Sequence, residues 1–437
     1  MSNIVLNHSF YPVGQGLFSF GEVSLGDCGR ASFTWIYDCG TTSSQSYLDD
    51  ALNRFLAVKH VDLVTISHFD KDHISGMVEL LMKVSVENLL LPYMPLWQRL
   101  VLIIEANITF RAPLARFLLD PVGFISEIPN ANVGRVLFAM PSGERGGPAR
   151  IPEAEPDGRP PLDEQIRTKK IRKAPENVNE RNTLEIDIEV IDEVSLPPED
   201  ERRRYKEEVK SGIEVLYLSA GSAIIVSGFW EFVPYNDASL AGRISKGFKA
   251  NVEKLRYDLL NEPDPDDKTL ALFGLRKAYL KTFGFGSEER NIISLFLYTG
   301  AINRRPYWNS STSYKNRYGW LDYAHRASDV CQTRGAVLYT GDGYLNSQHR
   351  FDALSEYLGE ERMESIHVLQ VMHHGSRNNW FPGIAAKIRP KNSVFSSDPT
   401  HRGYKHPHAE VLRDFWEFGP IQVDKNNGVD FEMRLSW

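Results

Sequence analysis

The stretch TISHFDKDHISGM, residues 65–77, carries four side chains of metal-ligand type within six positions: His68, Asp70, Asp72 and His73. An apolar run over residues 61–66 precedes them, and an apolar pattern at helical spacing over residues 74–84 follows. This pattern predicts a strand, a sharp turn and a helix. Imidazoles and carboxylates gathered at such a turn are typical ligands of zinc or manganese.

The turn allows two interpretations. If His68 and Asp70 point to one side and Asp72 and His73 to the other, they supply two metals about 3.5–4 Å apart, a spacing that suits hydrolysis. Alternatively, this is a polar loop in which Asp72 caps the helix that follows. The density of ligand-type residues favours the metal site.

The composition is that of a soluble globular protein, with 42% hydrophobic and 24% charged residues among 437. This length predicts one large domain with insertions, or two to three domains. A net charge of −7 gives no general sign of nucleic-acid binding but allows a local basic face. We expect a cytoplasmic protein, because there is no long apolar run or signal peptide and the three cysteines form no disulfide pattern.

The N-terminal part alternates strand and helix patterns. Strands are predicted over residues 16–25, 32–40, 61–67 and 86–94, and helices over 46–58 and from residue 74. Further strands are predicted over 291–300, 335–343, 365–376 and 392–398, with a hairpin over 213–235 and helices over 244–262 and 268–283. This order favours a layered α/β fold.

A charged segment interrupts this pattern. Residues 143–210 contain 14 basic and 18 acidic residues, too many charges to bury much apolar surface. We interpret residues 143–211 as a linker or solvated arm, in part a charged helix over 197–211. The predicted organisation is therefore a first half over 1–94, an insertion over 95–285 and a second half over 286–437.

The segment HFDKDHISG (68–76) resembles the H-x-[HD]-x-D-H-[IL]-x-G signature of the metallo-β-lactamase fold. Asp70, in place of the usual second histidine, resembles the ComEC-like nuclease branch. Six more segments resemble motifs of that branch, in its order: VGQG (13–16), WIYDCG (35–40), NIISL (291–295), LYTGDG (338–343), VMHHGSRNN (371–379) and GYKHPHAEVL (403–412). Pro12 and Leu17 stand where the branch has aspartates around VGQG. The resemblance implies an αββα sandwich of two mixed sheets, interrupted by the long charged insertion.

The resemblance also implies two divalent ions, Mn²⁺ or Zn²⁺, and a set of ligands for them: His68 and Asp70 at the first ion, Asp72, His73 and His373 at the second, and Asp342 bridging both. Such ions lower the pKa of water from 15.7 toward roughly 7, so that hydroxide can attack phosphorus at neutral pH. Asp72 is therefore also expected to be catalytic.

Further residues near these motifs are candidates with weaker support. His374 and His406 are expected to hold phosphate or to protonate the leaving oxygen, and Ser376 and Lys405 to bind phosphate. Asp38 is expected to orient the metal ligands by hydrogen bonds without binding the metal itself. A purely structural role stays open for each of them.

One local clue concerns the substrate. Residues 301–320 contain Arg304, Arg305, Lys315 and Arg317, five interleaved Tyr or Trp residues and no acidic residue. Cations track a nucleic-acid backbone and aromatic rings stack on bases. The segment lies between two predicted site strands, so it is expected to overhang the site. The alternative is a surface loop whose aromatic rings pack on its own base.

We therefore predict a metal-dependent phosphodiester hydrolase, first of all a cytoplasmic DNase. The alternatives are a phosphodiesterase on a small substrate (a cyclic nucleotide or a phosphocholine ester), a lactone or β-lactam hydrolase, and a non-catalytic scaffold. The complete ligand set disfavours the scaffold, and Asp70 together with the lack of a secretion signal disfavours a β-lactamase. Because a free DNase is toxic, we expect a regulatory partner, by analogy an NTPase of an anti-phage defence pair, docked on the insertion.

Overall fold

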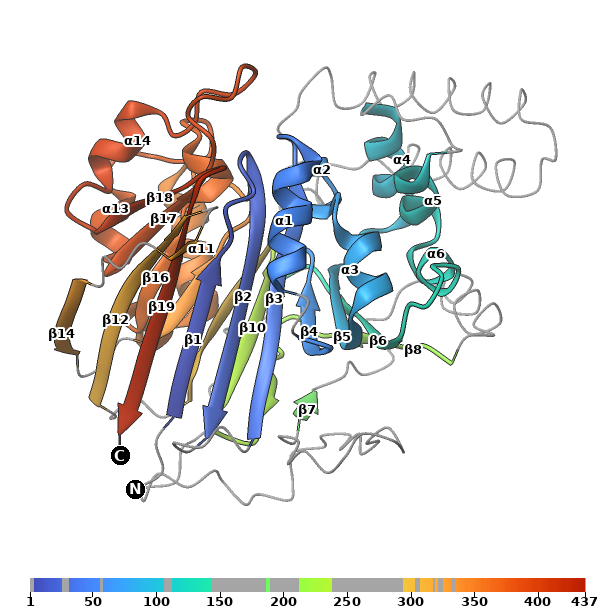
Figure 1. The fold of residues 1–437 in the computed structure, drawn as a ribbon, viewed down its shortest axis with the longest axis horizontal. Coiled ribbons are helices and arrows are strands. Elements are labelled where there is room, and N and C mark those ends of the chain that lie inside the picture. Colours follow the sequence, from blue (N-terminus) through green and yellow to red (C-terminus); the bar gives the residue numbers. More distant parts are fainter. Residues whose placement is uncertain are drawn as a thin grey trace.

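The computed structural model describes residues 4–25, 31–55, 58–105, 112–142, 186–188, 212–237, 294–302, 307–316, 319–320, 325–331 and 335–436. In this part of the chain two mixed sheets face each other, with helices outside them (Figure 1). No helix within these residues is long and apolar enough to cross a membrane.

The first sheet has eleven strands. In order across it lie β13 (Gly319–Trp320), β12 (Tyr307–Asn316), β19 (Asn427–Ser436), β1 (Ile4–Phe10), β2 (Gly16–Leu25), β3 (Ala31–Thr41), β4 (His60–Thr65), β5 (Ser85–Pro92), β6 (Val133–Ala139) and β8 (Glu214–Leu218). β14 (His325–Cys331) pairs with β12. The run from β3 to β8 is parallel, whereas β19, β1, β2 and β3 are antiparallel neighbours.

The second sheet has eight strands: β18 (Pro420–Val423), β17 (Asn392–Ser396), β16 (Ile366–Gln370), β15 (Ala336–Tyr339), β11 (Leu295–Ala301), β10 (Trp230–Asn236), β9 (Ile224–Val226) and β7 (Ile186–Ile188). β15 to β18 run parallel. In β1 of the first sheet, buried Ile4, Leu6 and Phe10 alternate with half-buried residues and contact this second sheet, as a strand with one buried face requires.

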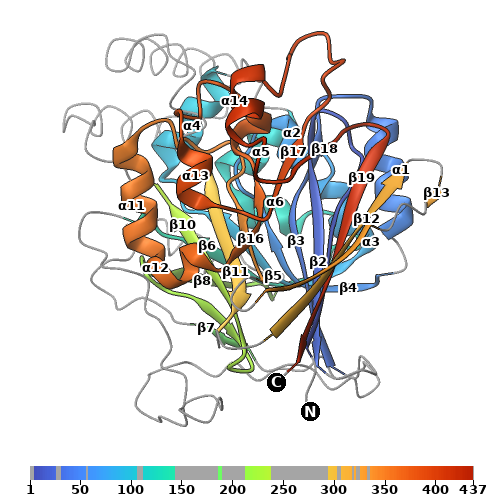
Figure 2. The same cartoon turned by 90° about the vertical axis from the view of Figure 1, so that its left-hand side faces the viewer.

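Helices cover the outer face of each sheet. Against the first sheet pack α1 (Gln45–Phe55), α3 (Met77–Lys83), α4 (Leu96–Glu105), α5 (Pro113–Leu119) and α6 (Pro121–Ser126). Against the second sheet pack α11 (Gln348–Leu358), α12 (Glu360–Glu364), α13 (Ile384–Ile388) and α14 (Ala409–Asp414). Figure 2 shows α11 and α12 on one side of the sheets and α1 and α3 on the other. Three apolar clusters thus separate four layers, an α/β sandwich.

The parallel strands of both sheets end at one edge of the sandwich. In an open α/β sheet such an edge is where ligands bind. The backbone N–H of Leu295 donates to the Ser67 carbonyl at 2.8 Å, and the Ser396 hydroxyl donates to the Gly16 carbonyl at 2.8 Å. These two bonds join the sheets at that edge.

Most of the strands predicted from the sequence are confirmed, but two predictions are wrong. Residues 213–235 do not form one hairpin, because β8 pairs with β6 in the first sheet and only β9 and β10 form a hairpin in the second. Within residues 301–320, the described residues 307–316 do not form a loop over the site, because they form β12, which pairs with β19 along ten residues and extends the first sheet. A strand's partner depends on distant residues, which a local pattern cannot identify.

The predicted insertion over 95–285 supplies strands to both sheets, β6 and β8 to one and β7, β9 and β10 to the other. Apart from β7, the charged segment 143–211 lies outside the described residues, as do the helices predicted over 197–211, 244–262 and 268–283. The division of the chain at residues 94 and 285 stays a prediction.

The close approach of β3 to α2 (Lys71–Ile74) generates a test of the fold. A Cβ at residue 40 would lie 2.5 Å from the His73 backbone nitrogen and 2.6 Å from the Asp72 carbonyl carbon. We expect Gly40→Ala to lower the free energy of unfolding by roughly 1–3 kcal/mol, because backbone must move. Urea denaturation measures this, with Gly403→Ala as control, where the nearest atom is 3.4 Å away. Equal losses in both variants would contradict the packing described.

Candidate metal centre

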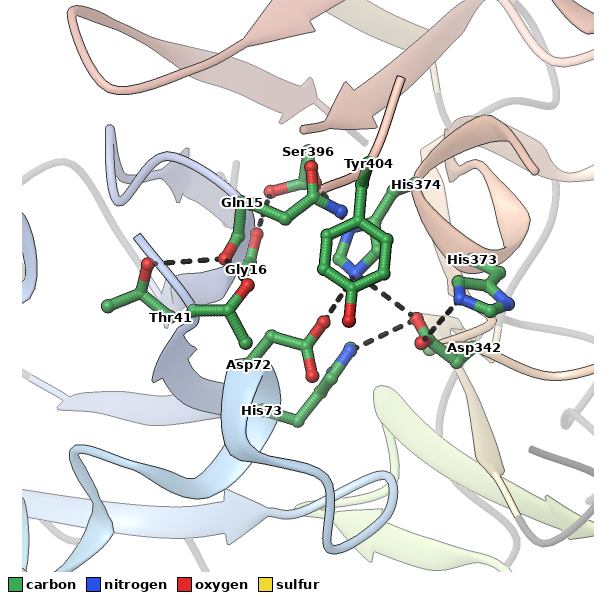
Figure 3. Close-up of polar contacts among 12 residues, drawn as sticks. Gln15, Gly16, Thr41, Asp72, His73, Asp342, His373, His374, Ser396 and Tyr404 are labelled. Atoms are coloured by element: carbon green, nitrogen blue, oxygen red, sulfur yellow. Dashed lines mark hydrogen bonds and ion pairs between the residues drawn. The ribbon is translucent and has the colours of Figure 1, made fainter. Parts of the chain in front are cut away.

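The residues of the HFDKDHISG stretch lie where β4 ends and α2 begins. His68 follows the strand, Asp70 is the residue before the first turn of α2, and Asp72 and His73 lie within the helix. Asp72 therefore does not cap the helix. Its Oδ2 atom lies 3.2 Å from His374 Nε2, on the loop that follows β16 (Figure 3). The capping interpretation of this stretch is wrong.

The Asp342 carboxylate, at the end of β15, lies among four imidazoles. Its Oδ1 atom is 3.0 Å from His73 Nε2 and 3.4 Å from His374 Nε2. Its Oδ2 atom is 3.3 Å from His373 Nε2 and 3.7 Å from His68 Nε2. Each oxygen thus faces one pair of imidazoles, as Figure 3 shows for three of the four rings.

All four imidazoles are held from outside through Nδ1. The partners of His68, His73, His373 and His374 are, in that order, Ser67 Oγ at 2.9 Å, Asp38 Oδ2 at 2.6 Å, Asn379 Oδ1 at 2.9 Å and the Ser396 carbonyl at 2.5 Å. Each partner accepts a hydrogen bond, so each Nδ1 donates. When such a ring is neutral, its lone pair is on Nε2 and is directed at the centre, which is how metal-binding histidines are oriented.

Two of these acceptor assignments follow from neighbouring bonds. The Ser67 hydroxyl donates to Asp38 Oδ2 at 2.6 Å, so its oxygen is free to accept from His68. The Asn379 amide donates to the Asp342 carbonyl at 2.8 Å, which turns its oxygen toward His373. The outer partners therefore determine the tautomers of the rings they hold.

Three buried atoms of the centre have no hydrogen-bond partner in the described structure: His68 Nε2, His73 Nε2 and Asp342 Oδ1. Leaving such an atom unsatisfied costs about 1–3 kcal/mol. Within 4.8 Å of one another lie ligand atoms of Asp72, His73, Asp342 and His374, and also ligand atoms of His68, Asp70 and Asp72. The buried cluster can hold a metal ion, and cations bound to these two groups of ligand atoms would satisfy the three atoms.

The charges of the centre show the same need for a cation. Burial disfavours ionised Asp342, but His373, His73 and His374 outweigh it and hold its pKa well below the ordinary value. Burial opposes a charged His73, but Asp342 and Asp38 raise its pKa well above the usual range. Burial lowers the pKa of His68 to about 4, which leaves its ring neutral at pH 7. Protons thus balance carboxylates where a metal would otherwise do so.

Asp72 is ionised as well. Burial alone would raise its pKa, but the hydrogen bond from His374 and the charge of His73 lower it to about 2. Its carboxylate is shared by both groups of candidate ligands. The centre therefore combines anionic oxygens and imidazole nitrogens at short range, the donor set of zinc and manganese sites.

Neither His373 nor His374 lies where we expected it. We expected His373 beside Asp72 and His73, but it lies on the Oδ2 side of Asp342 with His68. His374, expected to hold phosphate or supply a proton, is fully buried beside Asp72 and His73 instead. Both residues have positive φ, 43° for His373 and 58° for His374, so the backbone reverses between them in a way that spacing does not indicate.

The remaining expected residues lie around this cluster. Asp38 is buried and accepts from the Ser67 backbone at 2.6 Å as well as from His73, as an outer supporting residue would. The Ser376 hydroxyl accepts from the Asn378 backbone at 3.3 Å, and Lys405 is exposed. Burial lowers the pKa of His406 to about 3, so its ring is neutral at pH 7 and is a poor proton donor.

Four residues of the site were missed in the sequence. Ser67 and Asn379 hold ligands, and Figure 3 shows Gln15 and Tyr404 among the residues around the cluster. All four lie inside stretches quoted above, but nothing in those stretches separates them from structural residues. Of the expected nucleic-acid ligands, Lys315 lies in β12, and Arg304, Arg305 and Arg317 lie outside the described residues.

No family model matches the chain, and no curated protein matches it. The function must therefore be argued from the residues of the centre.

Removing the central carboxylate tests the site. We expect the wild type to retain Mn²⁺ or Zn²⁺ after dialysis, and Asp342→Asn to retain much less, because both imidazole pairs lose their shared anion. Elemental analysis gives the metal content. Asp414→Asn is the matched control, because that carboxylate accepts from Trp380 and Gly383 and is not among the candidate ligands. Equal metal content in all three proteins would contradict the assignment.

Proposed function

We propose that the chain is a two-metal phosphodiester hydrolase of the metallo-β-lactamase fold, related to its ComEC-like nuclease branch. The proposal is supported above all by the surroundings of the Asp342 carboxylate, whose two oxygens each face a separate pair of imidazole nitrogens at 3.0–3.7 Å. A site for a single ion does not need ligands on both oxygens. A carboxylate between two cations offsets their mutual repulsion, and this suits a bridging ligand.

The ligands divide into two sets around that carboxylate. Asp72, His73 and His374 belong with Oδ1, and His68 and His373 with Oδ2, with Asp70 close to His68 and Asp72. Each side then has two imidazoles. This balance makes zinc as suitable as manganese, because imidazole suits zinc and carboxylate suits manganese.

Divalent ions in this centre would lower the pKa of water toward neutrality and offset the charge on phosphoryl oxygens. The chain's own residues supply the geometry. Asp38, Ser67, Asn379 and the Ser396 carbonyl lock the imidazoles, so that little reorganisation is needed during reaction. Such preorganisation is compatible with a catalytic centre and with a structural metal site.

For the substrate we propose nucleic acid, with DNA first. The support is the basic and aromatic composition of residues 301–320, together with the resemblance to a nuclease branch. A cytoplasmic location, a role in anti-phage defence and a regulatory NTPase partner remain parts of this proposal that rest on analogy.

Ligand removal tests the activity directly. Purified protein should cleave plasmid, single-stranded DNA or RNA, and bis-p-nitrophenyl phosphate, with Mn²⁺, Mg²⁺ or Zn²⁺ supplied in turn. Asp72→Ala and His73→Ala should each lose at least about 100-fold in rate, because even supporting residues of metal sites contribute 10- to 100-fold. His349→Ala, at an exposed position of α11, is the control. Near-full activity of either cluster variant would place the active site elsewhere.

A quadruple variant tests whether the substrate is a polymer. Replacing Arg304, Arg305, Lys315 and Arg317 by Ala should slow DNA cleavage strongly and leave bis-p-nitrophenyl phosphate hydrolysis almost unchanged, because only the polymer has flanking phosphates. The logarithm of DNA affinity falls by about 0.7–0.9 per contact per log unit of salt, so the variant should have a shallower salt dependence.

Identical DNA cleavage by variant and wild type at every salt concentration would remove the support for a polymer. A small phosphodiester would then be the better substrate.

A further inference from the structure

The VGQG loop, residues 13–16, packs tightly beside the centre. Gly14 has φ of +81°, a conformation that suits glycine. A Cβ at Gly16 would lie 2.3 Å from the Gly40 carbonyl oxygen and 2.9 Å from that of Asp72. The two glycines thus bring the backbone against the ends of β3 and α2, and Gln15 between them is next to the metal ligands.

The backbone of Gln15 is bonded on both sides. Its N–H donates to the Ser43 hydroxyl at 2.9 Å, and its carbonyl accepts from the Thr42 N–H at 2.8 Å. These bonds hold the position of the residue without using its side chain. The side chain is therefore positioned by a rigid loop, as a functional group requires.

The orientation of the Gln15 amide follows from one hydrogen bond. Its Oε1 accepts from the Asp398 backbone N–H at 3.2 Å, so Nε2 must face the other way. In Figure 3 that nitrogen points toward His374, one of the candidate ligands. The residue is only 1% exposed, and no acceptor among the described residues bonds Nε2.

We infer that Gln15 Nε2 donates a hydrogen bond to a non-bridging oxygen of the phosphoryl group bound at the centre. This inference rests on the proposed function and names one more residue that contacts the substrate. The Gln15 Nε2 group has no acceptor among the described residues, and a phosphoryl oxygen bound beside it would supply one. An amide also suits this position because it is neutral, whereas a lysine or arginine would repel cations in the same cluster.

The test compares Gln15→Glu and Gln15→Ala with wild type and with Gln45→Ala, a glutamine exposed on α1. Gln15→Glu keeps the carbon skeleton and the acceptor for Asp398 but replaces the donor by an anionic oxygen, whereas Gln15→Ala removes the donor without adding a charge. The probe is inorganic phosphate, titrated calorimetrically into Mn²⁺-loaded protein. We expect phosphate to bind at least about 10-fold more weakly to both Gln15 variants, with metal content unchanged. Gln45→Ala should match wild type.

Kinetics provide the second measurement. On bis-p-nitrophenyl phosphate, kcat should fall by about 10²–10³ in both Gln15 variants, the usual loss for one donor to a developing anion. A structural role in the loop would lower stability in Gln15→Ala but leave Gln15→Glu active. Unchanged phosphate affinity in Gln15→Glu, or loss of its metal, would overturn the inference, as would a wild type that does not bind phosphate.

The two proposals can fail separately. If metal-loaded wild type binds phosphate through Gln15 but hydrolyses no phosphodiester, the proposed function fails and the contact stands. If wild type hydrolyses phosphodiesters and Gln15→Glu does so equally well, the contact fails and the proposed function stands.

Discussion

The buried carboxylate of Asp342 is the interaction on which the rest of the site depends. An anion at this depth is costly unless positive charge surrounds it, and the chain directs four imidazoles at its two oxygens. Those rings need fixed tautomers, which Ser67, Asp38, Asn379 and the Ser396 carbonyl provide. The imidazoles and their outer hydrogen-bond partners are thus arranged around the charge of the Asp342 carboxylate.

The fold brings the candidate ligands and the residues that hold them together from both sheets. Asp38 lies in β3 of the first sheet and His73 in α2, the helix that follows β4, whereas Asp342 and His374 follow strands of the second sheet. Below the centre, Tyr37 stacks on Tyr339 with ring centroids 4.3 Å apart, and the Tyr37 hydroxyl donates to the Leu295 carbonyl at 2.6 Å. Apolar packing and polar bonds thus align the two sheet edges, so that stability of the sandwich and geometry of the site are coupled.

Features that depend on neighbouring residues could be predicted from the sequence, whereas features that depend on distant contacts could not. Residues 68–73 follow a buried strand directly, so their gathering at a turn could be deduced, and Asp342 follows a strand in the same manner. The positions of His373 and His374 could not be deduced, because they depend on positive φ angles at these two consecutive residues. The pairing of β12 with β19, and of β8 with β6, depends on partners far along the chain. Gln15 was visible only as part of a motif, since its role depends on which way one amide is turned.

A two-metal centre is tested most directly by anomalous diffraction at the manganese edge from crystals of Mn²⁺-loaded protein. We expect two peaks, one on each side of the Asp342 carboxylate and about 3.5–4 Å apart. Asp72, His73 and His374 should surround one peak, and His68 and His373 the other. A single peak, or peaks away from Asp342, would contradict a two-metal centre.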